Sequence, residues 1–410
     1  MPDVRLPALP TFLGLALGIG LGLLAGGRAG FAPVIAVVAP VGTLWLRALQ
    51  MTIIPLVSAL LVIGVVQTAE AAAAGRIARR TLGLFAAILL VSTVVAALVV
   101  PPILDSFPIP ARAAQALRAS GGGDTGPVPS LADFFAALVP ANIIQAAASD
   151  AVLPTIVFFA LFAVALTRLP RAPRQLVARL FAAIAAALLV VIGWVLRLAP
   201  VGVFALSFAV AAKSGSATIV ALAHYIAVVS SIGGLVLIAA YVLAVAAARQ
   251  RLAGFAATLL PVQAVALSTQ SSLASLPAML AACRELGLRQ ATAEFVLPLA
   301  VALFRATGPG MNVAVAIYVA RLTGVAVPPQ ALAAGVLVAF LTTIGAVSLP
   351  GAISYITSIA PIALAMGVPV APLALLVAVE MLPDLMRTVG NVTMDVAVTA
   401  TVDRWTRQRG

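Results

Sequence analysis

The stretch VEMLPDLMRTVGNVTMDVAVTATV, residues 379–402, is long and apolar enough to cross a membrane, yet its interior carries charged and amide side chains. A charged side chain at the bilayer centre costs roughly 2.5–3.5 kcal/mol on insertion scales. These polar residues recur every three or four positions, at Glu380, Asp384, Arg387, Asn391 and Asp395. At 3.6 residues per turn, this spacing predicts one polar helix face, with Thr388 at its edge. Such groups mark a functional site by default; the alternative is a set of structural ion pairs.

The rest of the chain has the composition of a helical membrane protein. Of its 410 residues, 63% are hydrophobic and 9% are charged, whereas soluble domains average about 45–50% apolar and about 25% charged residues. Apolar runs of about 20 residues recur, as a hydrocarbon layer about 30 Å thick requires, and they lack the alternation of barrel strands. The net charge of +12 therefore indicates arginine-rich cytoplasmic loops and not a nucleic-acid partner.

The arginines predict the orientation of the chain. Six apolar helices are expected before residue 252, near 8–26, 38–67, 81–104, 140–167, 176–212 and 216–248. Arginine clusters follow the second, fourth and sixth of these helices and also close the chain. If the N-terminus is cytoplasmic, every cluster is cytoplasmic, as the positive-inside rule requires. With no cleavable signal or sorting motif, we predict a multi-pass protein of a bacterial inner membrane with both termini in the cytoplasm.

Two later segments are apolar but interrupted by serine and proline. Both contain Ser-Leu-Pro, at Ser275–Pro277 and Ser348–Pro350, and a long helix with buried charge follows each. Such a pair of interrupted segments is typical of inverted-repeat transporters, because irregular backbone at membrane depth must be buried in protein or line a cavity. We predict two re-entrant hairpins whose tips meet; the alternative is a pair of proline-kinked helices.

Asp384 and Arg387 indicate the class of substrate. A carboxylate and a guanidinium about one turn apart offer opposite charges to a single ligand. An acidic α-amino acid fits, with its ammonium on Asp384 and its distal carboxylate bidentate on Arg387. Its α-carboxylate would need backbone N–H donors, which Ser271-Ser272 and helix N-termini could supply.

Three motifs together resemble the dicarboxylate/amino acid:cation symporter family, which includes glutamate transporters and archaeal aspartate transporters. STQSSLASLP, residues 268–277, resembles the serine-rich first hairpin of that family. SLPGA, residues 348–352, resembles the tip of the second hairpin, and DLMRTVGNVTMD, residues 384–395, the signature of the last helix. The similarity extends over nearly the whole chain.

This resemblance implies an all-α fold of eight transmembrane helices plus two re-entrant hairpins, built as inverted repeats and assembled as a homotrimer. Residues 1–252 would mainly form the trimerisation scaffold, with the third and sixth helices joining the transport domain. Residues 253–410 would form the transport core: hairpin 253–284, helix 290–321, hairpin 330–368 and helix 372–404. Its function would be cation-coupled symport of aspartate or glutamate by an elevator movement, with the lipid bilayer, the substrate and further copies of the chain as partners and with no cofactor.

The resemblance also assigns the substrate site. Asp384 would bind the amino group and Arg387 the side-chain carboxylate, with Thr388 and Asn391 making further polar contacts. The other expected substrate residues are Gln270, Ser271, Ser272, Thr307 and Leu349. Carriers of four-carbon dicarboxylates lack the aspartate, so the presence of Asp384 favours an amino acid; a dicarboxylate carrier is the alternative.

The chain departs from the family at its sodium sites. The family has Asn-Met-Asp-Gly-Thr in its seventh helix, where this chain has Phe304-Arg305-Ala306-Thr307-Gly308. We hypothesise that Arg305 replaces that sodium ion and pairs with Asp395. Protons would then couple transport through the expected ion site: Arg305, Glu380, Asn391 and Asp395, with Asp384 as a further proton carrier.

Two other interpretations of Arg305 remain open. Sodium could still bind backbone carbonyls of the second hairpin, at Thr343, Ile344 and Ala346, or Arg305 could abolish coupling and leave a uniporter. An enzyme is not expected, because no nucleophile or metal-binding motif occurs and His224 is the single histidine. A receptor or an anion channel is the remaining class. We also expect Pro383 to loosen the last helix and Pro309 to follow a break near Arg305.

Overall fold

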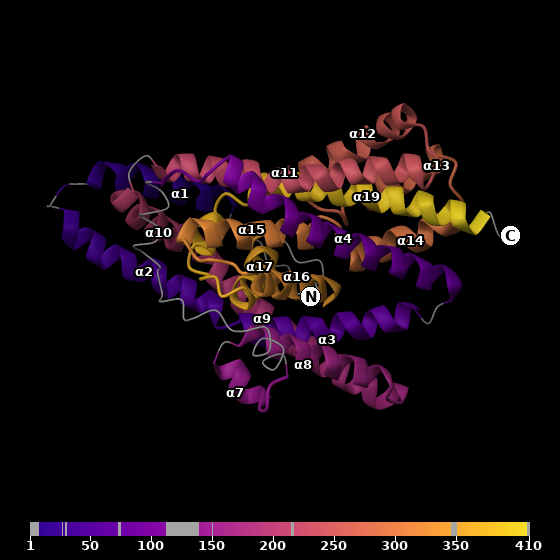
Figure 1. Ribbon diagram of the computed structural model, residues 1–410, viewed down its shortest axis with the longest axis horizontal. Helices are drawn as coiled ribbons and strands as arrows, with labels where there is room; N and C mark the ends of the chain where they lie inside the picture. Colours follow the sequence, from indigo (N-terminus) through magenta and orange to yellow (C-terminus); the bar gives the residue numbers. More distant parts are fainter. Residues whose placement is uncertain are drawn as a thin grey trace.

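The computed structural model describes residues 8–26, 28, 31–72, 75–111, 139–149, 151–214, 217–345 and 351–407. Throughout these residues the regular structure is helical, and none of them forms a strand (Figure 1). The predicted all-α class is therefore confirmed, while the count of eight spanning helices and the elevator arrangement stay predictions.

The first half of the chain forms more helices than the sequence predicted. They are α1 (Ala8–Ala25), α2 (Ala32–Gln50), α3 (Ile53–Ala72), α4 (Arg76–Ser106), α7 (Ile143–Ala148), α8 (Val152–Thr167), α9 (Arg171–Arg197), α10 (Ala199–Ser214) and α11 (Ala217–Ala246). Three of the predicted spans, 38–67, 140–167 and 176–212, are each divided into two helices. The helix after each break carries a proline in its first turn, namely Pro55, Pro154 and Pro200. Proline is tolerated there because the first N–H groups of a helix have no intrahelical partner.

The second half forms two helix pairs and two broken helices. The pairs are α12 (Leu252–Thr269) with α13 (Leu276–Glu285), and α16 (Pro329–Gly345) with α17 (Gly351–Ala365), and the two members of each pair contact one another. Between the pairs, α14 (Gln290–Leu303) and α15 (Gly308–Thr323) are separated at residues 304–307, the break that Pro309 indicated.

The predicted continuous helix 372–404 is wrong at its start. The structure has α18 (Leu373–Leu376), a turn over residues 377–380, and then α19 (Met381–Arg407). Pro383 therefore lies in the first turn of α19, where it removes no helical hydrogen bond and does not loosen the helix. Glu380 precedes α19, and its carbonyl oxygen accepts a hydrogen bond from the Asp384 amide (2.9 Å).

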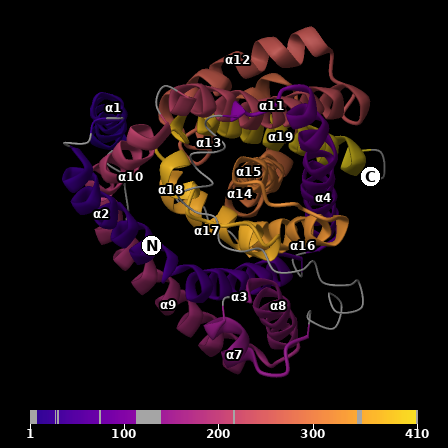
Figure 2. The same ribbon diagram turned by 60° about the vertical axis from the view of Figure 1, so that its left-hand side comes forward.

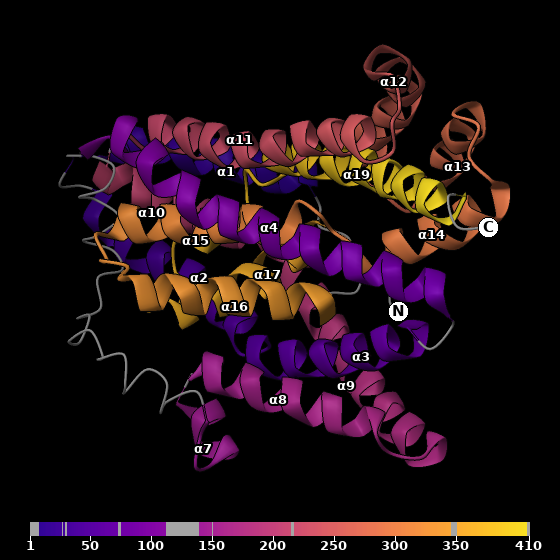
Figure 3. The same cartoon turned by 45° about the vertical axis from the view of Figure 1, so that its right-hand side comes forward.

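Helix α15 lies at the centre of the molecule (Figure 2), and α14 lies towards the end that carries the C-terminus (Figure 3). Apart from Arg321, every residue of α15 is buried, and the helix contacts α4, α11, α16 and α17. On one side, α11 and α19 lie side by side. On the other side, α16 separates α15 from α3, and α8 lies beyond α3 (Figure 3).

Several helices have the length and composition of membrane spans. Five apolar helical segments of the described chain are long enough: Ala32–Ala71, Ile77–Ser106, Arg171–Arg197, Ile219–Ala246 and Gln290–Thr323. Helix α19 has 27 residues and is about 40 Å long at 1.5 Å per residue, but its charged side chains lower its hydropathy. The spans support a protein that crosses the membrane many times.

Candidate substrate and ion site

The break in the central helix is held against α19 by one amide side chain. Asn391 Oδ1 accepts hydrogen bonds from the Thr307 backbone N–H (3.0 Å) and from the Thr307 hydroxyl (2.9 Å). The hydroxyl also lies 3.1 Å from the carbonyl oxygen of Arg387. Thr307 and Asn391 are both buried, so the structure places these two predicted residues together and uses them to join the broken helix to α19.

Arg387 is the centre of a buried ionic network. Its guanidinium lies 2.8 Å from Glu380 Oε1 and 3.3 Å from Asp384 Oδ1, and it donates to Asn312 Oδ1 on α15 at 3.0 Å. All three charged side chains are at most 18% exposed. The structure therefore brings Asp384 and Arg387 together, and in this state Arg387 is bound by protein carboxylates. Their role in substrate binding stays a prediction.

Two tyrosines extend this network beyond α19. The Tyr225 hydroxyl on α11 donates to Glu380 Oε2 at 3.0 Å, and it lies 3.1 Å from the hydroxyl of Tyr355 on α17. Because Tyr225 has a single hydroxyl proton, Tyr355 must donate to Tyr225. Both rings are buried. Sequence reasoning missed Tyr225, Tyr355 and Asn312; a tyrosine inside an apolar helix is a usable signal, since a buried hydroxyl needs a partner.

Arg305 and Asp395 do not form the predicted ion pair. Both carboxylate oxygens of Asp395 are buried without a hydrogen-bond partner among the described residues, and the side chain is 0% exposed. Arg305 lies in the break of the central helix, and its charge interacts with those of Asp384 and Arg387 instead.

A model of the sodium:dicarboxylate symporter family matches residues 8–405. The chain belongs to the sodium:dicarboxylate symporter family. Curated members of similar sequence include the proton/sodium-glutamate symport protein of Bacillus subtilis, 25% identical over 97% of this chain and 92% of that protein. The proton/glutamate-aspartate symporter of Escherichia coli is 26% identical over 91% of this chain and 86% of its own. The C4-dicarboxylate transport protein of Anaeromyxobacter sp. strain K is 27% identical over 97% of this chain and 90% of that protein.

Membership of the sodium:dicarboxylate symporter family confirms the resemblance that the motifs predicted. Its members are transporters and not enzymes, and the names of these relatives cover both acidic amino acids and four-carbon dicarboxylates. The names of the glutamate carriers give a proton or sodium as the coupled ion. A co-transported cation is therefore consistent with membership of this family.

One aromatic pair occupies the position where the resemblance places a sodium-binding asparagine. Phe304 stacks on Phe85 of α4, with ring centroids 4.2 Å apart and an interplanar angle of 4°. Both side chains are buried. Two phenyl rings supply no oxygen ligand, so this part of the symporter offers packing where sodium would need carboxylate or carbonyl oxygens.

The structure describes the first hairpin tip but not the second. Gln270 ends α12 in the left-handed region (φ 49°), and the Ser271 side chain accepts a hydrogen bond from the Ala274 amide at 3.2 Å. Ser272 follows in the same tip and is half-buried. Leu349 and Ala346 lie outside the described residues, so the meeting of the two tips stays a prediction.

The remaining predicted ligands occupy helices. Thr343 and Ile344 belong to the last turn of α16, and the Thr343 hydroxyl donates to the Ala339 carbonyl at 2.7 Å. Thr388 is buried on α19, and its hydroxyl donates to the carbonyl oxygen of Asp384 at 2.9 Å. Both hydroxyls thus satisfy helix carbonyls in this state.

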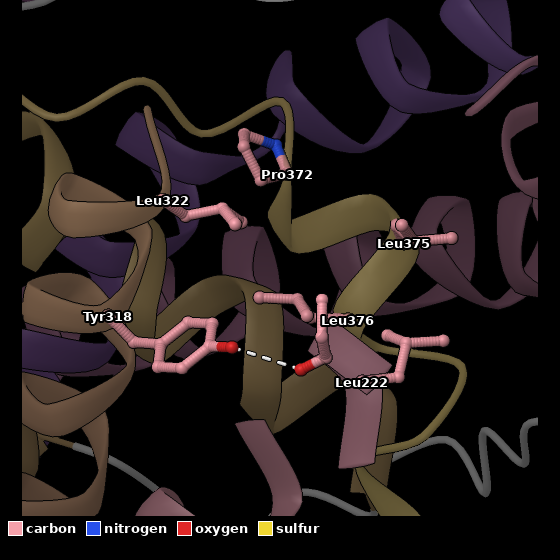
Figure 4. Close-up of a pocket in the computed structure, with 7 residues that line it drawn as sticks. Leu222, Tyr318, Leu322, Pro372, Leu375 and Leu376 are labelled. Atoms are coloured by element: carbon pink, nitrogen blue, oxygen red, sulfur yellow. Dashed lines mark hydrogen bonds between the residues drawn. The ribbon is translucent and has the colours of Figure 1, made fainter. Parts of the chain in front are cut away.

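A small pocket beside Tyr318 is not part of the substrate site. Figure 4 shows Leu222, Leu322, Pro372, Leu375 and Leu376 around it. The Tyr318 hydroxyl donates to the carbonyl oxygen of Ala221 at 2.9 Å. A volume of about 10 Å³ with an apolar lining excludes an amino-acid ligand.

Proposed function

We propose that this family member is a secondary symporter of aspartate or glutamate in a bacterial inner membrane. The observation that carries the proposal is the pair of Asp384 and Arg387, partly exposed and 3.3 Å apart on one face of α19. An acidic amino acid brings an ammonium for the carboxylate and a distal carboxylate for the guanidinium, so each member of the pair gains a partner of opposite charge from the substrate. A ligand without an amine leaves Asp384 with no cationic partner from the substrate.

We infer that protons and not sodium couple this transport. Phe304 and Ala306 replace an asparagine and an aspartate that the resemblance makes sodium ligands, and Phe304 is packed against Phe85. Asp395 is a fully buried carboxylate with no hydrogen-bond partner in the described part of the chain. Such a group is neutralised by a proton or bound by a cation. Without those neighbouring oxygen ligands, a proton on one of the buried carboxylates Glu380, Asp384 and Asp395 is the favoured coupling ion.

An uptake assay in proteoliposomes tests this function. Purified protein would be reconstituted and given labelled aspartate or glutamate under separate proton, sodium and potassium gradients. We expect accumulation driven by an inside-alkaline pH gradient and no dependence on sodium. Accumulation that requires sodium would contradict proton coupling, and indifference to both acids under every gradient would overturn the symporter proposal.

The second candidate is a carrier of four-carbon dicarboxylates. It is favoured by relatives with that name and by a second cation, Arg305, whose charge interacts with the same site. Two guanidinium groups could bind the two carboxylates of succinate. Unlabelled succinate and aspartate would be compared as competitors in the same assay; stronger competition by succinate would favour this function.

A further inference from the structure

The carboxylate of Glu380 is held in a closed set of partners. On one side it accepts from Arg387 through Oε1 at 2.8 Å, and on the other it accepts from Tyr225 through Oε2 at 3.0 Å. Tyr355 lies behind Tyr225. Asp384 is the other carboxylate on Arg387. Glu380 is 4% exposed, so its charge depends on these partners and not on water.

An acidic amino acid competes with Glu380 for its partner. When the distal carboxylate of the substrate takes the guanidinium of Arg387 and the ammonium takes Asp384, Glu380 keeps only a hydrogen bond from a neutral tyrosine. An ionised carboxylate in that position is buried without a counter-ion, which is strongly unfavourable. Removing one member of a buried ion pair leaves this kind of uncompensated charge.

The net charge of the site shows what can offset the negative charge that the substrate adds. Glu380 and Asp384 carry two negative charges, and Arg387 and Arg305 carry two positive charges, so the empty site is neutral. An acidic amino acid has two carboxylates and one ammonium and adds a charge of −1. One proton returns the occupied site to neutrality.

We propose that Glu380 is the proton site of this transporter, and that it binds a proton when the substrate displaces it from Arg387. The proton occupies Oε1, the oxygen that Arg387 leaves, because Oε2 continues to accept from Tyr225. Release of the substrate returns Arg387 to Glu380 and expels the proton on the same side of the membrane. This proposal rests on the proposed function and selects one carboxylate among those that could carry the proton.

Proton uptake on binding distinguishes this site from the other buried carboxylates. Calorimetric titration of the purified protein with L-aspartate, in buffers of different ionisation enthalpy at one pH, counts the protons bound. We expect about one proton per aspartate for the wild type, and none for Glu380→Gln, which resembles the protonated acid. The matched control Glu294→Gln, at an exposed position of α14, should behave as the wild type does.

The same variants then separate binding from coupling in proteoliposomes. Glu380→Gln should exchange internal for external labelled aspartate but lose accumulation driven by a pH gradient. Proton uptake that persists in Glu380→Gln, or that is lost only in Asp395→Asn, would overturn the proposal. If Glu380→Gln binds no aspartate, Tyr225→Phe decides: a displaced pH profile of aspartate binding supports the proton site, and an unchanged profile overturns it.

Failure of the proton site and failure of the proposed function give different results. A wild type that binds and transports acidic amino acids without taking up a proton refutes the role of Glu380 alone. A wild type that transports neither aspartate nor glutamate under any gradient refutes the function on which this inference rests.

Discussion

The Asp384 carboxylate lies 3.3 Å from Arg387 and is exposed enough to meet a ligand, so its charge should decide whether an amine is recognised. We expect Asp384→Asn to weaken aspartate binding by roughly 10- to 150-fold, since a hydrogen bond to a charged group contributes about 1.5–3 kcal/mol. Competition by succinate should weaken less. Both are measured by displacement of labelled aspartate.

The control for this variant makes the same chemical change at a surface pair. Asp105 lies 2.6 Å from Arg321, and both side chains are about half exposed or more. Such pairs contribute little, so Asp105→Asn should leave affinity unchanged. Equal losses of affinity for aspartate and succinate in Asp384→Asn would show that Asp384 does not bind the ammonium group of the substrate.

Tyr225 is a positioning residue for Glu380, the carboxylate that we propose as the proton site. Tyr225→Phe removes the donor to ionised Glu380 while keeping the ring. Protonated Glu380 then becomes relatively more favourable, so aspartate binding should persist to more alkaline pH, by about one unit or more. Binding titrations across pH measure the shift. Tyr241→Phe is the matched control, because that tyrosine binds Gln263; a shift of equal size there would contradict the role of Tyr225.

At the scale of elements, the contact between α19 and the break of the central helix depends on a glycine. A Cβ atom on Gly390 would lie 2.5 Å from Thr307 Cγ2, closer than carbon atoms approach without a shift. Gly390→Ala should therefore displace Thr307 from Asn391, destabilise the protein by about 1–3 kcal/mol and lower substrate affinity. Thermal unfolding in detergent and binding titration measure the two effects.

A second glycine offers the opposite environment for comparison. Gly83 lies in α4, and a Cβ atom there would meet no heavy atom within 4 Å. Gly83→Ala should keep or raise the unfolding temperature, because alanine favours a helix interior over glycine by about 1 kcal/mol. If the two variants have the same unfolding temperature, the contact between α19 and the broken helix does not depend on the close packing at Gly390.

For the whole molecule, the elevator prediction requires α16 and α17 to slide past α3. Ile54 and Leu364 line one cavity of about 330 Å³ where α3 and α17 approach. On a Cys283→Ser background, we expect Ile54→Cys with Leu364→Cys, bridged by a flexible bis-maleimide, to bind aspartate but not transport it. Each single variant treated with the same reagent is the control. Transport that continues after complete bridging would exclude this direction of movement.

The oligomer is a separate expectation at this scale. The resemblance implies three copies of the 41.4 kDa chain, and native mass spectrometry in detergent measures the number directly. A stable monomer with full transport activity would contradict the predicted homotrimer.

Prolines show how far sequence patterns predict the elements. Pro55, Pro200 and Pro383 lie inside apolar runs, and we expected continuous or loosened helices there. In the structure each lies in the first turn of a new helix. A proline is compatible with a kink, where one upstream carbonyl loses its N–H donor, and with a helix start, where the missing N–H costs no helical hydrogen bond. Which of the two forms depends on what the flanking helices pack against.

The sequence alone determined the membrane class, the two Ser-Leu-Pro segments and the face of α19 that carries Asp384, Arg387, Asn391 and Asp395, because composition and helical periodicity are local properties. Only the tertiary structure decided the partners of these groups. Glu380 meets Arg387 and Tyr225, residues 7 and 155 positions away, whereas the buried Asp395 carboxylate finds no hydrogen-bond partner among the residues that the structure describes. Pairing of charges depends on which helices the fold brings together, and in a low-dielectric interior that choice decides which carboxylate stays charged.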